Sequence, residues 1–288
     1  MPNWVANNIE LSGESKDIKK LLETVKSKES DFDFNNIMLM PEALKGTSSP
    51  AKIVSQEEYD IQQAKKQVIA KKLKKGTELS KEEKQAHEWG IGMGGITKAM
   101  QKDLRNKYGT DNWYDWTCNN WGTKWNACEP QVDEIYISFN TAWAHPAPII
   151  QKLSEEFPNV TLEVAYADED FSHNCAKYEM TSGVMTECEF PEGGSREAIE
   201  LALEVGGDDE YYLYRIFEDY SAEEVKESEH MKILLTMSVE RDYVDEDLEV
   251  DLLELAQEIA IDLVQLDKAD KYGGWIKEAK EKELKKMD

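Results

Sequence analysis

The sequence has few cysteines and no pattern that would give them a structural task. Cys118, Cys128, Cys175 and Cys188 are scattered, and no two of them form a C-x-x-C pair. This spacing argues against a disulfide framework and against a zinc knuckle, so we interpret all four as reduced thiols. Cys118 and Cys128 could meet a metal together with His145 or His173, but the ligand spacing of known metal sites is missing. We therefore expect neither a metal nor a cofactor.

A membrane-spanning segment and a secretion signal are missing as well. No run of about eighteen apolar residues occurs, which is the length a helix needs to cross a bilayer. The N-terminus opens on a polar strand instead of a basic stretch followed by an apolar one. With 288 residues, of which 40% are hydrophobic and 9% aromatic, the chain can fill a core. We expect a folded cytoplasmic protein with no membrane partner.

Catalytic motifs are also lacking. The four histidines, His87, His145, His173 and His230, lie in four separate segments, and none belongs to a metal-binding motif. His145, at the end of a predicted strand, is the best single candidate for a general base, although no motif places a nucleophile beside it. An enzyme built around His145, Asp115 and Cys118 is the weakest of three hypotheses. The glycine-rich run at 90–95 lacks the Gly-Lys-Ser/Thr ending of a phosphate loop and is interpreted as a hinge.

The chain has a large excess of negative charge, which is unevenly distributed along the sequence. The net charge is −25. Residues 186–267 hold 26 acidic and 5 basic side chains, which gives 5 − 26 = −21, whereas residues 51–107 hold 13 basic and 8 acidic ones, which gives +5. A strongly acidic surface repels nucleic acid and anionic membranes and attracts basic grooves, including those that hold DNA or RNA.

The first two-thirds of the chain alternate between strands and helices. Residues 4–11 read as a strand, and Ser15 begins a helix whose apolar residues recur at helical spacing. A short strand is expected around 32–37. Residues 51–107 have the composition of an inserted helical hairpin, with basic residues between Lys65 and Lys75 and a second helix beginning at Ser80.

After this insertion the alternation resumes. A strand over 135–141, a helix opened by Pro146 and Pro148, a strand over 160–166 and a hairpin over 176–188 are predicted. The order is β-α-β, insertion, β-α-β-β-β. We predict an α+β fold, with an antiparallel sheet that carries two helices on one face and occupies residues 1–190 together with the insertion at 45–107.

Residues 191–288 are predicted to form an acidic, mainly helical C-terminal region. It begins with a helix capped by Ser195, followed by the aromatic segment of Tyr211, Tyr212 and Tyr214. Residues 231–239 read as a buried strand. A long helix follows, on which Leu248, Leu252, Leu255, Ile259, Leu263 and Leu266 recur at spacings of three and four. This apolar row is either an intramolecular core face or a dimer seam, so a homo-oligomer stays open.

Four of the 8 tryptophans lie between residues 112 and 125, too close together for one helix or strand face to bury them. We expect an irregular segment that plugs one end of a core, because exposed tryptophans in this number would favour aggregation. The alternative is a platform that stacks nucleobases. The residues of this structural motif are Trp113, Tyr114, Trp116, Asn120, Trp121, Gly122, Trp125 and Trp143.

Several short motifs carry a family resemblance. They are Met1-Pro2-Asn3-Trp4, Met40-Pro41-Glu42, the tryptophan cluster, and Phe139-Asn140-Thr141-Ala142-Trp143 followed by Pro146. In this order they resemble the YubB-type ferredoxin-like proteins of phages and plasmids, over residues 1–44 and about 108–190. The resemblance implies a ferredoxin-like fold and a gene carried by a mobile element. That family has no well-established chemistry, so no activity follows from it.

A row of carboxylates lies one position before the C-terminal apolar row and is the basis of our functional prediction; the alternative is an ordinary solvated helix face. Side chains three or four apart on a helix stand about 5–6 Å apart, near the spacing of roughly 6–7 Å between phosphates along a strand. We expect a non-enzymatic phage or mobile-element protein that binds and blocks a host protein with a basic or nucleic-acid-binding surface. Counter-defence against a restriction, CRISPR or Gabija-type target is the expected purpose. The expected contact residues are Asp247, Asp251, Glu254, Glu258 and Asp262, with Tyr211, Tyr212 and Tyr214 as aromatic anchors.

The rival hypothesis is a nucleic-acid-binding accessory protein. It would use the basic insertion between Lys65 and Lys75, plus Trp113, Trp116, Trp121 and Trp125 if these are exposed. The large negative charge makes nucleic acid the less favoured partner of the two.

Overall fold

The computed structural model describes residues 3–81, 84, 94–206, 217 and 220–287. Two compact units divide the chain. The first unit comprises residues 1–164 and 178–187, and the second comprises residues 165–177 and 188–288. Each unit is described by itself below.

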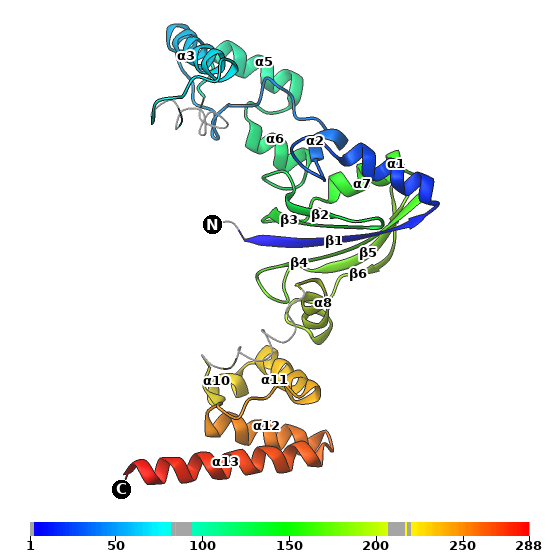
Figure 1. Cartoon of the computed structure of the whole chain (residues 1–288), viewed down its shortest axis with the longest axis vertical. Coiled ribbons are helices and arrows are strands. Elements are labelled where there is room, and N and C mark those ends of the chain that lie inside the picture. The colour runs from blue at the N-terminus through cyan, green and yellow to red at the C-terminus, as the bar shows by residue number, and fades with distance from the viewer. Residues whose placement is uncertain (1–2, 82–83, 85–93, 207–216, 218–219, 288) are drawn as a thin grey trace. The chain divides into compact units, whose positions relative to one another are not determined.

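A six-stranded sheet organises the first unit (Figure 1). Its strand order is β2-β3-β1-β4-β5-β6, and β3 runs antiparallel to both β1 and β2. Helices α1 (Ser15–Val25) and α7 (Ala147–Glu156) lie on the same face. The order β2-β3-β1-β4, with a helix after β1 and another after β3, is ferredoxin-like, as predicted. The strands are β1 (Trp4–Gly13), β2 (Cys128–Val132), β3 (Tyr136–Ala142), β4 (Val160–Asp168), β5 (Ala176–Thr181) and β6 (Val184–Glu189).

The core of this unit lies between the sheet and the two helices. Alternate residues of each strand turn toward the helices because the side-chain period of a strand is two. On β1 these are Val5, Asn7, Ile9 and Leu11, all buried. The helices meet them with apolar residues at helical spacing, which are Ile18, Leu21 and Val25 on α1 and Ile149, Ile150 and Leu153 on α7. The opposite face of β1 carries Trp4, Ala6, Asn8 and Glu10.

The predicted strand at 32–37 is wrong. Phe34–Ile37 form a short helix, α2, because the Asp33 carboxylate accepts a hydrogen bond from the backbone N–H of Asn35 and so caps a helical turn. Phe32 and Phe34 are fully buried, with ring centroids 5.6 Å apart. The strand that completes the ferredoxin-like order is β2, which the sequence did not reveal. It has only 5 residues, is partly buried, contains Pro130 and pairs with β3 in an irregular register, so its brief alternation is a weak signal of a strand.

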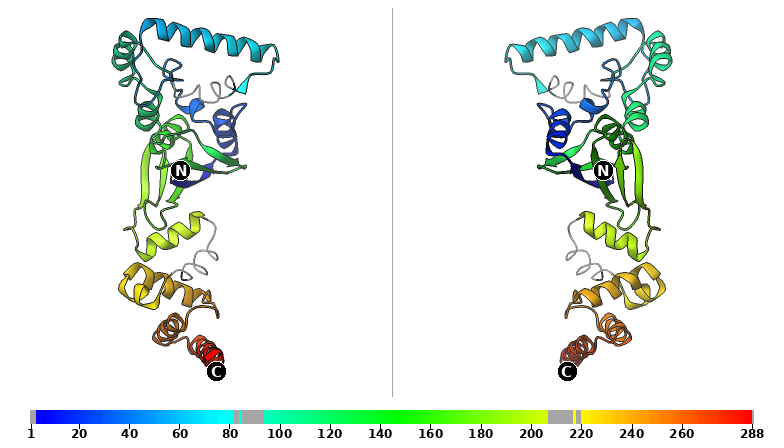
Figure 2. Two further views of the ribbon diagram at one scale, coloured as in Figure 1. Left: turned by 90° about the vertical axis from the view of Figure 1, so that its left-hand side faces the viewer. Right: turned by 90° about the vertical axis from the view of Figure 1, so that its right-hand side faces the viewer.

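Helices form the insertion, as predicted. The long helix α3 (Gln56–Lys74), seen lengthwise in Figure 2, begins with a capping box of Ser55 and Glu58. Helix α5 (Lys98–Tyr108) is capped by Thr97 and ends at Gly109, which takes the left-handed conformation that glycine tolerates best. The expected helix from Ser80, His87 and most of the glycine run at 90–95 lie outside the described residues.

The described residues of the second unit are mainly helical, as predicted. The helices are α8 (Arg196–Gly206), α10 (Ala222–Glu227), α11 (Glu229–Arg241), α12 (Val250–Asp262) and α13 (Leu266–Met287). One hydrophobic core joins them, and Leu234, Leu252 and Tyr272 are among its fully buried members. The predicted strand at 231–239 is wrong, because these residues lie in α11, whose first turn is capped by Ser228. A short apolar run cannot by itself distinguish a buried helix from a buried strand.

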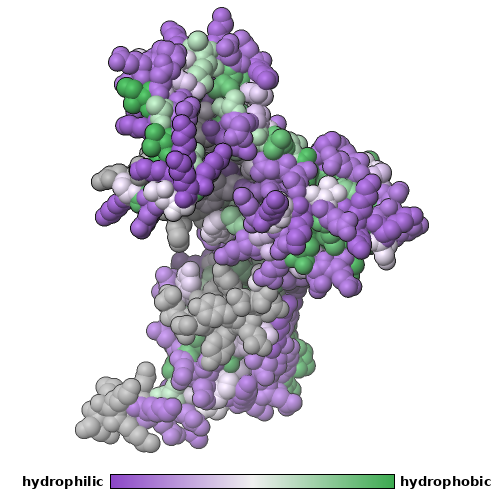
Figure 3. All heavy atoms as spheres, turned by 45° about the horizontal axis from the view of Figure 1, so that its top comes forward, coloured by the Kyte–Doolittle hydropathy of each residue, from purple (hydrophilic) through white to green (hydrophobic). Residues whose placement is uncertain are grey.

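The face shown in Figure 3 is dominated by hydrophilic residues, with smaller apolar areas between them. Within the described part of the chain, no helix combines the length and the apolar character needed to span a membrane.

Candidate functional site

Helix α12 carries most of the predicted row of carboxylates. Asp251, Glu258 and Asp262 are separated by seven and four residues, so they project from one side of the helix, and all three are exposed. Leu252, Leu253, Ala256 and Ala260 are completely buried on the other side. The amphipathic pattern therefore fixes which side of α12 faces solvent, and that side is acidic.

The first acid of the row, Asp247, lies outside the helix. Helix α12 begins at Val250, after Glu249 as its N-cap residue, and Asp247 belongs to the preceding turn. The backbone N–H of Asp247 donates to the carboxylate of Asp245. Carboxylates before the first turn of a helix are favoured by the positive end of its dipole, which gives part of this acidic run a local structural reason.

One acid of the row forms an ion pair within the unit, and the other four do not. Glu254 lies 2.6 Å from the ammonium of Lys280 on α13, so its charge is met within the unit. Among the residues that the structure describes, no cation lies within ion-pairing distance of Asp247, Asp251, Glu258 or Asp262. Four of the five predicted acids thus keep their charge available to solvent or to a partner.

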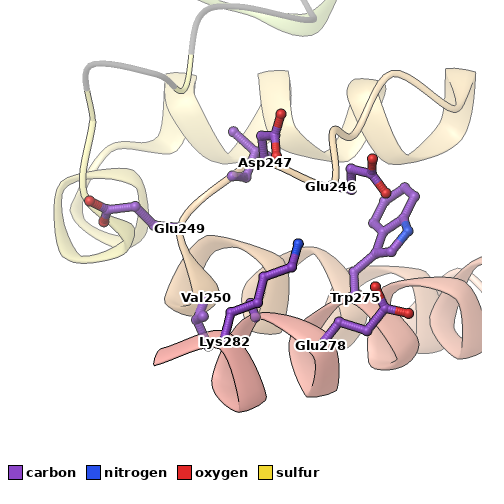
Figure 4. A pocket seen from close by; sticks show the side chains of 9 residues that line it. Glu246, Asp247, Glu249, Val250, Trp275, Glu278 and Lys282 are labelled. Carbon is purple, nitrogen blue, oxygen red and sulfur yellow. The ribbon is translucent and has the colours of Figure 1, made fainter. Parts of the chain in front are cut away.

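A pocket opens beside this row, between the turn before α12 and helix α13 (Figure 4). Its volume is about 230 Å³, and Trp275 forms an aromatic wall. Carboxylates surround it, and Lys282 reaches from α13 toward the turn that carries Asp247. Such a lining favours a cation, because carboxylates attract positive charge and an indole ring makes cation–π interactions; the Lys271 ammonium already lies 4.7 Å from the centroid of the Trp275 ring. The lining residues are Glu246, Asp247, Leu248, Glu249, Val250, Trp275, Glu278, Ala279 and Lys282.

The predicted apolar row of the same helix serves mainly the intramolecular core. Leu248 and Leu252 are buried, and Leu255, Ile259 and Leu263 are packed against the core while partly exposed. Leu266, at the start of α13, is 59% exposed. The predicted aromatic anchors Tyr211, Tyr212 and Tyr214 lie outside the described residues.

The tryptophan cluster is not irregular throughout, contrary to expectation. Trp113–Asn120 form helix α6, capped by Asn112, whose side chain accepts from the backbone N–H of Asp115. Trp116 and Trp121 are 6% and 3% exposed, and their rings meet edge to face at 5.7 Å. Both are therefore unable to stack on a nucleobase. Helix α6 buries Trp116, and its C-cap residue Trp121 is buried as well, whereas Trp113 and Trp125 are half-buried.

The remaining motif residues shape the loop after α6. Asn120 donates from its side chain to the carbonyl of Trp116, and Gly122 has a φ of 81°, in the left-handed region. A Cβ atom at Gly122 would lie 2.7 Å from Pro148, so glycine is required there for space as well as for conformation. Lys124 follows, with its ammonium 4.5 Å from the ring centroids of both Trp125 and Trp143. Trp143 is 44% exposed.

His145 takes part in a polar network of the core. Its Nδ1–H donates to the Asn7 side-chain oxygen at 2.7 Å, and its Nε2 accepts from the Tyr178 hydroxyl at 2.6 Å. Asn7 in turn donates to Thr141. Burial lowers the pKa of His145 to about 3, so the imidazole is neutral near pH 7 and a poor proton acceptor. The network holds the loop after β3 in place instead of supplying a general base.

The other residues of the enzyme hypothesis offer no better chemistry. Burial raises the pKa of the Cys118 thiol, which keeps it protonated and unreactive near pH 7. Asp115 lies in the first turn of α6 and accepts from the Asn112 side chain. In the described part of the chain, no three histidine, cysteine, aspartate or glutamate side chains come together in a way that could hold a metal ion.

The strand order and the two helices on one face give the sheet a ferredoxin-like α+β fold, and a family model that matches part of the chain agrees with this class. Residues 120–213 match the family model described as the ferredoxin-like domain in Api92-like protein. A solved structure, that of a protein Api92 from Yersinia pseudotuberculosis, shows 10% sequence identity and a TM-score of 0.32. The match covers 67% of this chain and 99% of that one. No curated protein matches the sequence.

Proposed function

We propose that this protein is a non-enzymatic binding protein whose second unit presents an acidic surface to a cationic macromolecule. The observation that carries the proposal is the exposed side of α12 with the preceding turn. There Asp247, Asp251, Glu258 and Asp262 meet no cation among the described residues. These acids lie in a region that holds 26 acidic and 5 basic side chains.

Electrostatics favours a binding role for this surface over a purely structural one. Like charges on one helix face repel one another, and repulsion on this scale opposes the compact state. A solvated helix face needs no more than a few charges to remain soluble. A basic groove would be attracted from a distance, which raises the rate of association and makes the complex sensitive to salt.

The spacing of the acids suits a surface that normally holds nucleic acid. Four residues of an α-helix rise about 6 Å, so the carboxylates of Glu258 and Asp262 stand at an interval near that of successive phosphates. We therefore infer that the partner is a protein whose basic surface binds DNA or RNA. Occupation of that surface would block it.

The pocket beside α12 gives the surface a specific contact. An arginine or lysine side chain of the partner fits between Trp275 and the surrounding carboxylates, where it gains both charge pairing and a cation–π interaction. Lys282 extends toward the same space from α13. It therefore competes with the side chain of the partner and moderates its affinity.

In its finer form the proposal is phage or mobile-element counter-defence in the bacterial cytoplasm. The support for it is the resemblance of the N-terminal motifs to YubB-type proteins, together with the charge of the second unit. A restriction, CRISPR or Gabija-type complex is the kind of target whose nucleic-acid groove such a surface would occupy.

Retention of a basic bacterial protein on the immobilised full chain tests the proposal. The decisive variant carries Asp247→Asn, Asp251→Asn, Glu254→Gln, Glu258→Gln and Asp262→Asn. At 150 mM salt the unmodified protein should retain its partner and release it when duplex DNA is added, because DNA and the acidic side compete for one groove. The variant should retain nothing. A separate variant that carries only Lys282→Gln should retain the partner more strongly than the unmodified protein.

A matched control separates the position of the charges from their number. Glu10, Glu23, Glu29, Asp103 and Glu134 are exposed carboxylates of the first unit. Neutralising these five changes the net charge by the same amount and should leave partner retention intact. Equal retention by the α12 variant, or equal loss in the control, would contradict the proposal.

A further inference from the structure

We propose a second binding site, on the first unit, that stacks the unpaired bases of a single-stranded nucleic acid. The site is the aromatic platform of Trp4, Lys124, Trp125 and Trp143, extended by neutral amides on the neighbouring strands. It goes beyond the proposed function, since it lies in a different unit and takes a ligand of opposite charge to the partner of α12.

The platform consists of aromatic rings arranged around one cation. The Lys124 ammonium lies 4.5 Å from the ring centroids of Trp125 and Trp143, so it is held between two indole rings. The ring of Trp4 continues the cluster at 5.8 Å from that of Trp125. Trp143 is 44% exposed and offers a ring surface on which a base can stack.

The backbone around the platform is firmly held. The Thr123 hydroxyl donates to the carbonyl of Ala142, and the Thr117 hydroxyl donates to the carbonyl of Lys124. Both threonines are buried. These bonds fix the Lys124 loop against β3 and α6, so a ligand would meet rings that are already ordered and would lose little entropy in binding them.

Trp143 itself has an unusual backbone conformation. Its φ is 70°, a left-handed value that is a genuine outlier for a bulky side chain. The backbone N–H of Trp143 donates to the carbonyl of Asn3, which extends the pairing of β1 with β3 by one bond. Strain of this kind persists where the surroundings impose it, and it often accompanies a functional position. The indole ring of Trp143 meets the ring of Tyr114 on α6 edge to face, with the centroids 6.3 Å apart.

Neutral amides continue the platform along the strands. Ala6 pairs with Asn140 and Asn8 pairs with Ser138 across β1 and β3, and Gln131 of β2 pairs with Ser138. Alternation places Asn140 on the face opposite the core, the same face as Trp4. Asparagine and glutamine amides bond the edges of bases that are not engaged in pairing. Aromatic rings with adjacent amides on an open sheet face thus suit unpaired bases.

Charge limits the extent of the site. No carboxylate among the described residues lies within ion-pairing distance of the Lys124 ammonium, so its charge can meet one phosphate. On strands β4 to β6 the carboxylates of Glu163, Glu179 and Glu187 are close together. Loss of solvation and the charges of Glu187 and Glu163 raise the pKa of Glu179. Phosphates would be repelled there, which confines a strand to the β2-β3-β1 side of the sheet.

Fluorescence anisotropy of labelled twelve-nucleotide single strands, (dT)12 and (rU)12, titrated with the full chain tests the proposal. Binding should be measurable at micromolar protein, and a duplex of the same length should not bind, because its bases are already stacked. The logarithm of the binding constant should fall with the logarithm of the salt concentration with a slope of about −0.7, the value for one neutralised phosphate on a single strand. A slope several times steeper would assign the binding to the lysines of α3 and overturn the proposal.

Two variants carry the test, and the second unit supplies a matched control. Trp143→Ala should weaken binding about tenfold, the loss typical of one stacked base. Lys124→Met keeps the packing of the side-chain stem and should abolish most of the salt dependence. Lys271 lies 4.7 Å from the ring centroid of Trp275, so Trp275→Ala removes a comparable tryptophan and leaves single-strand binding unchanged.

Three results would refute the site. They are no binding of either single strand at 50 mM salt, equal binding of duplex and single strand, and equal weakening by Trp143→Ala and Trp275→Ala. Binding of a neutral oligosaccharide in place of the oligonucleotides would also overturn it, since tryptophan platforms can stack on sugars. Circular dichroism of each variant checks that the fold is retained, and Lys124→Met keeps the test valid should Trp143→Ala fail to fold.

Discussion

The two units use their polar side chains in opposite ways. In the first unit Asn7 is buried beneath the helices, and its amide bonds the backbone, Thr141 and His145. In the second unit the acids of α12 point to solvent, and four of the five predicted ones meet no cation among the described residues. A satisfied buried network specifies one arrangement of loops and strands, whereas an exposed acidic face adds nothing to the packing and acts on other molecules.

The same contrast holds for aromatic residues. The first unit groups Trp4, Trp125 and Trp143 around Lys124 at the end of its sheet. The second unit places Trp275 beside an acidic pocket. The comparison teaches that the chain combines two surfaces of different chemistry, one aromatic with a single cation, the other acidic. Four substitutions or changes of condition test this comparison of the two units, from the largest expected effect to the smallest.

The largest effect is expected from Leu253→Ala. Leu253 is completely buried in the core of the second unit, and removal of a buried leucine side chain costs about 2–5 kcal/mol of unfolding free energy. Most tryptophans belong to the first unit, so their fluorescence should keep its denaturation midpoint while the helical circular dichroism signal unfolds earlier. One shared transition that shifts as a whole would show that the two units do not unfold separately.

The next effect concerns pH and His145. Its folded pKa, about 3, lies below its usual value of 6.5, so the unfolded chain binds a proton that the folded chain excludes. Stability should therefore fall as the pH drops below about 6.5 and continue to fall until about 3, by up to about 1.4 kcal/mol per pH unit.

The matched variant for this prediction is His145→Gln. It retains hydrogen-bonding capacity toward Asn7 and Tyr178 but does not titrate. Chemical denaturation of both proteins at several pH values should show a shallower slope for the variant. Identical slopes would mean that His145 is protonated in the folded protein and that the network is not as described.

A smaller effect is expected from the ion pair between α8 and α11. The hydrogen bond from Arg196 lowers the pKa of Glu240 below its usual 4.5, and the Nη2 of Arg196 lies 2.5 Å from the carboxylate. A depressed carboxyl pKa stabilises the fold above the unfolded value, and this contribution is lost as the pH falls through the folded value. Both side chains are partly exposed, so Glu240→Gln should cost at most about 1 kcal/mol at pH 7.

The difference between the two proteins should shrink as the pH falls below 4.5 and disappear once the pH lies below the lowered pKa of Glu240 in the folded protein. Thermal unfolding at pH 7 and in this acid range provides the comparison. A cost that stays constant with pH would point to packing of the glutamate side chain instead of its charge.

The smallest effect on stability belongs to the acidic side of α12. Glu258→Gln removes one exposed charge that has no cation beside it in the described chain, so unfolding free energy should change by less than about 0.5 kcal/mol. The change should be slightly stabilising, because repulsion decreases. A loss above 1 kcal/mol in denaturant titration would show that the acid is part of the fold and would weaken the case for a binding surface.

The sequence predicted the elements that have a clear period. The strand at 4–11, the helix from Ser15, the strand at 160–166 and the amphipathic pattern of α12 are all confirmed. The wrong or missing predictions concern short segments, in which a period is too brief to decide between a helix and a strand. Phe32 and Phe34 alternate like strand residues, but the Asp33 cap decides for a helical turn, and residues 231–239 form α11. Strand β2 is short and contains Pro130, and its pairing with β3 is what makes it a strand.

The candidate sites divide in the same way. The acids of α12 were visible because charge and helical spacing are properties of the sequence. The aromatic platform could not be predicted from the sequence. Its residues Trp4, Lys124 and Trp143 are far apart in the chain and come together through the pairing of β1 with β3. A sequence signal for it existed in the density of tryptophans, but it could not tell buried rings from exposed ones.

The sequence by itself determined the alternation of the longer strands with two helices, the concentration of negative charge after residue 186 and the acidic side of α12. These follow from composition and local periodicity, which are fixed by neighbouring residues. Tertiary structure alone decided that Lys280 neutralises Glu254, that Trp116 and Trp121 are buried, and that Lys124 lies between two indole rings. The reason is physical: burial and pairing depend on groups that the fold brings together from distant positions, and no local pattern encodes their distance.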